Sequence, residues 1–288
     1  MNIFYLVFGT DISYHLEAYL SIRSIQKQLT PEDRIFVQTT NPEFYKHASV
    51  EILPLSAQQI EKWKGTHNYI FRVKTLAIKE FAQEHPEEDL LYLDTDTFLY
   101  GQLDELRLRL QNGQGLMHKL EGHPESMKGG THKMWKIVKG RSYRGITLGE
   151  RHNMWNSGVL GIPASKAEQV LETSLSICDM MLDEGIKVHI IEQYCTSVAM
   201  EELTNLRLAC DHIGHYWGNK REWHHLSATI FLSSLMRGAD IEEEKMALTH
   251  DIMTRLPVSI HRPTTAVKIK KVIDKLFPNN NYQYVGKE

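Results

Sequence analysis

Short apolar runs alternate along this chain with segments in which apolar residues recur every three or four positions. The runs predict β-strands at residues 3–8, 34–38, 50–53, 90–93, 115–117 and 158–162. Between them, residues 13–28 and 69–83 place apolar side chains on one face of a helix. This alternation is typical of the α/β class, in which helices cover both faces of a mainly parallel sheet.

The stretch 121–150 interrupts the alternation, because it carries many glycines and basic residues but few apolar ones. Segments of this length without regular structure are uncommon in compact domains and usually bind or cover a ligand. Two predictions stay open, a mobile loop and a small structured insertion with its own hairpin.

Strand-like runs fade after about Trp223, and the remaining residues predict helices interrupted by Gly238, Pro257 and Pro263. We therefore expect a catalytic or binding domain over residues 1–222, followed by a helical C-terminal extension over residues 223–288.

Composition narrows the class of protein. The 288 residues are 42% hydrophobic and 24% charged, which is typical of a globular protein and excludes collagen-like or disordered chains. Lys plus Arg is 33 and Asp plus Glu is 36, so no basic excess favours a nucleic-acid partner. The early apolar run 3–8 lacks a basic flank and is too short for a signal peptide or a membrane span.

The cysteines indicate the compartment. Cys178, Cys195 and Cys210 are widely spaced and include no Cys-x-x-Cys pair, which argues against a disulfide framework or a cysteine zinc site. This pattern favours a reducing, cytoplasmic location.

The most informative segment places two acids directly after an apolar run, as Leu93-Asp94-Thr95-Asp96. In an extended chain, side chains two positions apart point to the same side, so both carboxylates can meet one cation. Oxygen ligands suit Mg²⁺ or Mn²⁺, which commonly also bind phosphates of a substrate. The alternative is a polar turn whose acids cap backbone amides.

Several segments, taken in order, resemble the motifs of one known family. They are Thr10-Asp11-Ile12-Ser13-Tyr14 with Ser21-Ile22-Arg23-Ser24, then Asp94-Thr95-Asp96, Asn156-Ser157-Gly158-Val159 and Glu192-Gln193. This set resembles the nucleotide loop, metal motif, sugar-site strand and acidic-Gln pair of retaining GT-A-fold glycosyltransferases. The family is of the glycogenin and lipopolysaccharide galactosyltransferase type, and the resemblance spans roughly residues 3–220.

The resemblance implies a Rossmann-like GT-A fold and transfer of a hexose from a nucleoside diphosphate sugar, such as a UDP-sugar, to a hydroxyl acceptor. Anomeric configuration would be retained, and the acceptor would be a glycan or lipid-linked glycan in cell-surface glycan synthesis. The implied nucleotide-binding residues are Phe8, Gly9, Thr10, Asp11, Tyr14, Arg72, Lys74, Asp94, Thr95, Ser157 and Lys220. The implied catalytic residues are Glu192, Gln193 and Asn156. Asp11 or Ser13 alternatively caps the first helix.

Arg72 and Lys74 are alternative candidates for one role. In the family, a basic residue near this position of the chain contacts the diphosphate. We favour Arg72, because a guanidinium fork matches phosphate oxygens better than an ammonium. Lys74 alternatively belongs to a solvated basic face.

The family completes its metal shell with a histidine in a His-x-x-Gly-x-x-Lys motif. Here His215-Tyr216-Trp217-Gly218-Asn219-Lys220 is one residue shorter, which leaves open whether His215 or His212 is the third ligand and whether Lys220 reaches the diphosphate. We favour His215, and an imidazole beside two carboxylates favours Mn²⁺ over Mg²⁺.

No side chain stands out as a covalent nucleophile, so we expect the acceptor to attack on the face from which the diphosphate departs. If a side chain does take part in the reaction, the candidate is Glu192, as a nucleophile or as a stabiliser of the transferred sugar. A sugar-phosphate nucleotidyltransferase is the alternative enzyme, although its Gly-rich loop would be reduced to Gly9. A non-catalytic domain that binds nucleotide sugars or glycans is the third alternative.

The tail 267–277 places Ile269, Val272, Ile273 and Leu276 on one helical stripe, with lysines elsewhere. A basic amphipathic helix of this kind binds anionic membrane surfaces, which would put the protein at the inner face of a membrane. The alternative is a terminal helix that packs its stripe on the domain.

Overall fold

The computed structural model describes residues 1–260 and 264–277 and confirms the predicted α/β class. A seven-stranded sheet has the order β12-β6-β11-β4-β1-β2-β3. Its strands are β1 (Asn2–Val7), β2 (Arg34–Thr39), β3 (Glu51–Pro54), β4 (Leu90–Leu93), β6 (Leu116–Met117), β11 (Val159–Ile162) and β12 (Arg207–Leu208). All pair in parallel except β11, which runs antiparallel to both β4 and β6. Every predicted strand is therefore present.

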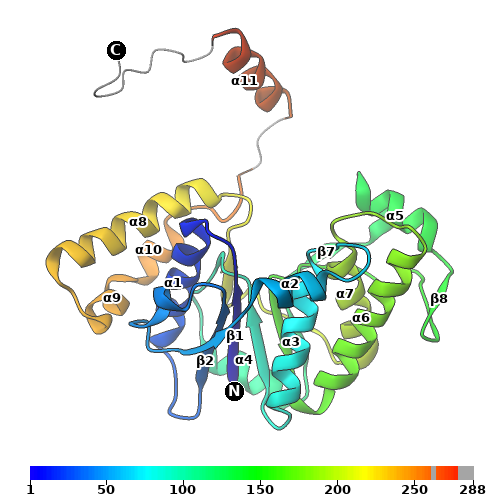
Figure 1. Ribbon diagram of the computed structural model, residues 1–288, viewed down its shortest axis with the longest axis horizontal. Helices are drawn as coiled ribbons and strands as arrows, with labels where there is room; N and C mark the ends of the chain where they lie inside the picture. Colours follow the sequence, from blue (N-terminus) through cyan, green and yellow to red (C-terminus); the bar gives the residue numbers. More distant parts are fainter. Residues whose placement is uncertain (261–263, 278–288) are drawn as a thin grey trace.

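Helices lie on both faces of this sheet (Figure 1). The helices of the first 222 residues that cover it are α1 (Ile12–Gln26), α2 (Ala57–Lys64), α3 (Arg72–Glu84), α4 (Leu103–Gln111), α6 (Ala167–Asp183) and α7 (Ile191–Leu203). Central strand β1 is buried on both faces of the sheet. Phe4 packs with α3 on one face, while Ile3 and Tyr5 pack with α1 on the other. A strand buried on both faces needs apolar residues at every position, which produces the continuous run in the sequence.

Residues 121–150 form an ordered insertion, so the expectation of a mobile loop is wrong and the structured alternative is correct. It contains α5 (Gly130–Val138) and the hairpin β8 (Ser142–Tyr143) and β9 (Ile146–Thr147). It is flanked by β7 (Leu120–Gly122) and β10 (Met154–Trp155), which pair with each other. Met134 and Trp135 anchor the insertion, since both are buried in a cluster with residues of α6 and α7.

Short elements complete this part of the chain. They are β5 (Thr97–Leu99), β13 (Ile213–His215), and the 3-10 turns Pro42–Tyr45, Pro124–Ser126 and Ala164–Lys166. Strands β5 and β13 pair antiparallel outside the main sheet, and this pairing matters for the site described below.

The C-terminal part is helical, as predicted, with α8 (Lys220–Arg237), α9 (Ile241–Ala247), α10 (His250–Thr254) and α11 (Thr264–Leu276). Gly238 closes α8 in a left-handed conformation with φ of 66°. The expected boundary after residue 222 falls inside α8. Buried Trp223 stacks on Phe98 and Tyr216, which lie before that boundary. A separate extension beyond residue 222 stays a prediction.

Within the described residues, no helix combines the length and the apolar character that crossing a membrane requires.

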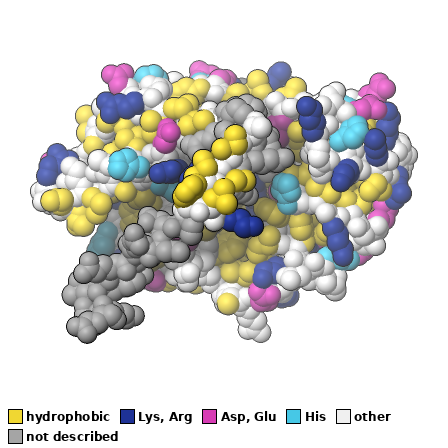
Figure 2. All heavy atoms as spheres, turned by 90° about the horizontal axis from the view of Figure 1, so that it is seen from above, with side chains coloured by type: hydrophobic (Ala, Val, Ile, Leu, Met, Phe, Trp, Pro, Cys, Tyr) yellow, Lys and Arg dark blue, Asp and Glu magenta, His cyan; other side chains and the backbone are white. Residues whose placement is uncertain are grey.

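Helix α11 stands apart from the rest of the chain in Figure 1. Its apolar stripe of Ile269, Val272, Ile273 and Leu276 is 51–68% exposed, so the alternative in which the stripe packs on the domain is wrong. Seen from above, hydrophobic side chains gather near the centre of this face of the molecule (Figure 2).

Candidate functional site

Two aspartates lie at the carboxyl end of β4, the edge at which open α/β sheets bind ligands. Asp94 follows the strand directly, and the chain then turns through Thr95 and Asp96 into β5. The predicted extended geometry is wrong, because a turn rather than the pleat brings the two carboxylates together. Asp94 accepts a hydrogen bond from the Tyr92 hydroxyl at 2.7 Å.

The pairing of β13 with β5 delivers a histidine to this turn. His215 stands opposite Thr97 in the ladder, and its Nε2 lies 3.1 Å from Oδ1 of Asp96. One ligand atom each from Asp94, Asp96 and His215 lies within 4.8 Å of the others. His212 instead accepts a hydrogen bond from the Gln102 amide at the start of α4, and of the two histidines it is His215 that lies beside both aspartates.

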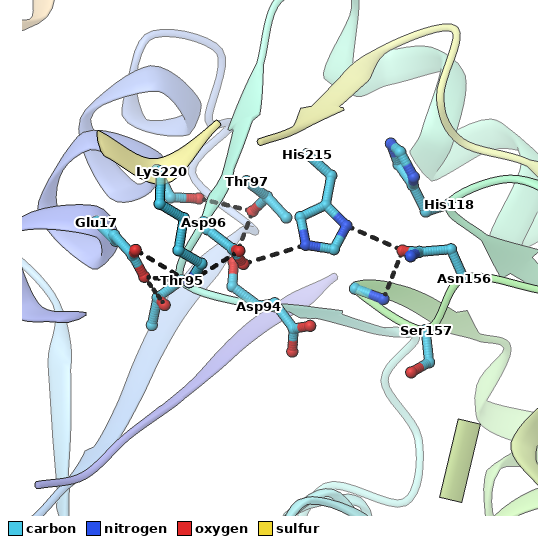
Figure 3. A network of polar contacts seen from close by, with 12 residues as sticks. Glu17, Asp94, Thr95, Asp96, Thr97, His118, Asn156, Ser157, His215 and Lys220 are labelled. Carbon is cyan, nitrogen blue, oxygen red and sulfur yellow. Dashed lines mark hydrogen bonds and ion pairs between the residues drawn. The ribbon is translucent and has the colours of Figure 1, made fainter. Parts of the chain in front are cut away.

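Asn156 orients the imidazole of His215 (Figure 3). Its Oδ1 lies 2.9 Å from Nδ1 of His215 and also accepts from the Gly158 amide at 3.1 Å. An amide oxygen accepts only, so Nδ1 of His215 carries a proton, and Nε2 faces the Asp96 carboxylate. Without a proton on Nε2, its lone pair and the Asp96 oxygen can bind one shared cation. The donor set therefore fits a divalent metal ion held by Asp94, Asp96 and His215.

Asp96 is buried, and the groups around it favour its ionised form. Burial alone would raise the pKa of its carboxyl, but the hydrogen bonds and charges of His215 and Lys220 outweigh burial and lower that pKa. Nζ of Lys220 lies 2.9 Å from Oδ2 of Asp96. Lys220 thus reaches the site despite the shortened spacing between it and His215.

Lys74 faces the site and Arg72 does not, so the preference for Arg72 is corrected. Nζ of Lys74 donates to the Ser157 carbonyl at 2.7 Å and lies 3.3 Å from Asp94. Burial would lower the pKa of Lys74, but Asp94 and Glu192 outweigh it and raise that pKa. Lys74 therefore contributes a positive charge beside the carboxylates.

Arg72 points to the other side of α3. Its guanidinium forms a bidentate pair with Asp179 of α6, at 2.7 and 2.9 Å, and donates to the Trp63 carbonyl. A cavity of about 560 Å³ lies there, but its Arg72 and Asp179 already neutralise each other. Arg72 and Lys74 point in nearly opposite directions because residues two positions apart on a helix lie about 200° apart around its axis.

A cleft of about 430 Å³ opens beside the aspartates. Its lining includes Phe8, Tyr14, Phe71, Asp94, Thr95, Asp96, His215, Trp217 and Lys220. Tyr14 is 44% exposed, and its ring lies 5.7 Å from Nζ of Lys220. Gly9 and Thr10 belong to the exposed connection from β1 to α1, and Asp11 caps α1 by accepting from the Ser13 amide.

The predicted sugar-site residues contact Lys74 or Glu121. Buried Glu192, at the start of α7, lies 4.0 Å from Nζ of Lys74, and burial raises its pKa. Gln193 and Asn156 both donate from their side-chain amides to Glu121 of β7, each at 3.0 Å. Ser157 follows Asn156, and its hydroxyl accepts from Lys74 at 3.1 Å.

Three polar residues of this region were absent from the sequence prediction. Glu121 holds the two amides described above, and buried His118 lies edge-on to the His215 ring, with burial lowering the pKa of His118 to about 4. Glu17 of α1 accepts from the Thr95 hydroxyl at 2.7 Å. The sequence held one indication that Glu17 is not an ordinary surface residue. It lies on the same helical face as Ser21 and Ser24, within the apolar pattern that predicts the first helix.

No protein-family model matches the chain, and no curated protein matches it either. Among solved structures, the chain is similar to mouse xyloside xylosyltransferase 1 in its apo form, with a TM-score of 0.45 and 12% sequence identity. The superposition covers 72% of this chain and 85% of that one. At this distance the likeness assigns neither a fold family nor an activity to the chain.

Proposed function

We propose that the protein is a metal-dependent glycosyltransferase of the GT-A type that moves a hexose from a UDP-sugar to a hydroxyl acceptor. One observation carries the proposal: Asp94, Asp96 and His215 present ligand atoms within 4.8 Å of one another at the carboxyl edge of the sheet. The sequence motifs that resemble those of the family, and that follow in the same order, support a nucleotide sugar as the donor.

The residues around the cleft divide into two groups by position. We assign the nucleotide to the side of Phe8 and Tyr14, where an exposed ring can stack on a base. Lys74 and Lys220 flank the carboxylates and offer ammonium groups to phosphate oxygens. Mn²⁺, or Mg²⁺ in its place, would neutralise the charge that develops on the departing diphosphate.

The sugar is assigned to the side of Asn156, Glu192 and Gln193. We expect the acceptor hydroxyl to form its bond to the anomeric carbon on the face from which the phosphate oxygen departs. The hydroxyl proton passes to that phosphate oxygen, and configuration is retained. The Glu192 carboxylate, buried and paired with Lys74, acts in this scheme as a stabiliser of positive charge on the sugar ring.

Two alternatives are separated by one experiment. The intact protein is incubated with a panel of UDP-sugars and Mn²⁺, and release of UDP is followed over time. A glycosyltransferase is expected to release UDP from one donor slowly without an acceptor, and the release should stop when EDTA removes the metal. A nucleotidyltransferase would instead form UDP-sugar from UTP and a sugar phosphate, and a binding domain would bind the donor without turnover.

Helix α11 suggests where the acceptor is found. We assign its exposed stripe to an anionic bilayer surface at the cytoplasmic face, because Lys270 and Lys275 lie among the apolar residues of the same helix. The carboxyl edge of the sheet lies on the same side of the molecule as α11 (Figure 1). A lipid-linked glycan acceptor would then meet the cleft at the membrane.

Vesicle binding tests the role of α11. The intact chain is expected to sediment with vesicles of equal phosphatidylglycerol and phosphatidylcholine, and far less with phosphatidylcholine alone. Replacing Ile269 and Ile273 together by Glu should lower the bound fraction at least about tenfold, because two charges enter the buried face. Leu235→Glu is the control, since Leu235 on α8 is 75% exposed and so even more accessible than Ile269 or Ile273. Equal sedimentation of all variants would exclude the membrane contact.

A further inference from the structure

Glu17 is a fully buried carboxylate in the second turn of α1, and the groups that bind it come from distant parts of the chain. Its Oε2 accepts from the Thr95 hydroxyl at 2.7 Å, and its two oxygens lie 3.0 and 3.2 Å from Nζ of Lys220. Nε2 of His224 lies 2.6 Å from Oε1. Glu17 therefore joins α1, the turn that carries both aspartates, and the first turns of α8 (Figure 3).

A buried charge persists in a fold only when its partners compensate for lost hydration. The partners of Glu17 are all polar, and two of them, Thr95 and Lys220, line the cleft. Lys220 is 37% exposed and His224 is 28% exposed, so either side chain would reach water if Glu17 did not bind it. The carboxylate thus restrains Lys220 and His224 at the start of α8.

The contacts of Lys220 show what its restraint by Glu17 achieves. Its ammonium has three N–H donors. Both oxygens of Glu17 accept from the ammonium, and Oδ2 of Asp96 lies 2.9 Å from it. The N–H that Asp96 accepts would turn to the cleft once Asp96 binds a cation, because Lys220 is a lining residue of that cleft.

We propose that Glu17 is a positioning residue that holds Lys220 against the cleft, so that its ammonium meets the diphosphate of the donor. The inference rests on the proposed function, because it needs a diphosphate at the aspartate turn. A cation bound by Asp96 would draw that carboxylate away from Lys220, and Glu17 then becomes the anchor that keeps the lysine in place. The hydrogen bond from Thr95 to Glu17 fixes the same turn from its other side.

Calorimetric titration of UDP in the presence of Mn²⁺ tests the proposal on the intact chain. Glu17→Gln keeps the size of the side chain and removes its charge. We expect UDP affinity to fall roughly 10- to 100-fold, by analogy with the range found when a partner of a metal ligand is replaced. Glu17→Asp keeps the charge and should lose less. Glu244→Gln is the matched control, since Glu244 also pairs with α1, through Arg23, but lies outside the cleft lining.

A double-mutant cycle separates positioning from a structural role. If Glu17 acts through Lys220, Glu17→Gln should cause less than a twofold further loss of UDP affinity when Lys220→Met is already present. Equal losses with and without Lys220 would overturn the proposal, and so would unchanged UDP affinity in Glu17→Gln. If Glu17→Gln does not fold, Glu17→Asp takes its place in the same cycle. Failure of the unaltered protein to bind UDP with Mn²⁺ would overturn the proposed function as well, which distinguishes the two failures.

Discussion

Asp96→Asn is expected to abolish Mn²⁺-dependent UDP binding and sugar transfer, with a loss of at least about 100-fold in each. Asparagine has the shape of aspartate but not its charge, and Asp96 is the carboxylate that faces both His215 and Lys220. Without that charge, the two remaining ligands of the cluster cannot hold a divalent ion strongly. Calorimetry with Mn²⁺ and UDP measures the binding, and UDP release from the donor measures the transfer.

The control for this change is Asp104→Asn, which removes an exposed carboxylate on α4 that pairs with Arg107. It should leave binding and transfer unchanged, because exposed ion pairs contribute little. Circular dichroism of both variants should match that of the unaltered protein. An Asp96→Asn protein that still transfers sugar would contradict the proposed mechanism.

Gly158→Ala is expected to remove metal-dependent UDP binding almost completely, although residue 158 contributes no side chain to the site. A Cβ at this position would lie 2.2 Å from Cε1 and 2.4 Å from Nδ1 of His215. The imidazole must move, and it then loses both its hydrogen bond to Asn156 and its position beside Asp96. Overpacking of this kind also lowers the free energy of unfolding by about 1–3 kcal/mol.

Gly149→Ala is the matched control, since a Cβ there meets no atom within 4 Å. Its unfolding free energy should stay within about 0.5 kcal/mol of the unaltered protein, and its UDP affinity should not change. Thermal unfolding and titration of UDP with Mn²⁺ check both variants. Normal UDP affinity in Gly158→Ala would show that His215 is not a ligand.

The strands of the sheet could be predicted because most of them are buried on both faces. Their apolar runs are continuous, and each is closed by polar or turn-forming residues. Strand β12 escaped prediction because its two residues, Arg207 and Leu208, are exposed at the edge. Nothing in such a short polar segment distinguishes a strand from a loop.

The insertion shows how composition can hide a helix. Met134, Trp135 and Val138 have helical spacing and are buried against α6 and α7, but glycines and basic residues surround them. The apolar face is short, and its partners come much later in the chain. Burial of Trp135 therefore became visible only in the folded structure.

The site was predictable where residue type and order carried the chemistry, as for Asp94, Asp96 and His215. It was not predictable where orientation decided the outcome. Choosing between Arg72 and Lys74 depends on which side of α3 meets Asp179. Glu17 was missed for a related reason, because an acid within a helix usually faces water until a partner such as Lys220 is placed beside it.

The candidate metal centre joins parts of the chain that are synthesised far apart in time. Asp96 and His215 are 119 positions apart, and Glu17 and Lys220 are 203 positions apart. A ribosome-bound fragment that ends before β13 lacks the imidazole and the lysine, however well its sheet has formed. Nascent chains should therefore be inert toward nucleotide and ion until β13 and the start of α8 emerge, and loading of the centre should report that the chain has folded up to that point.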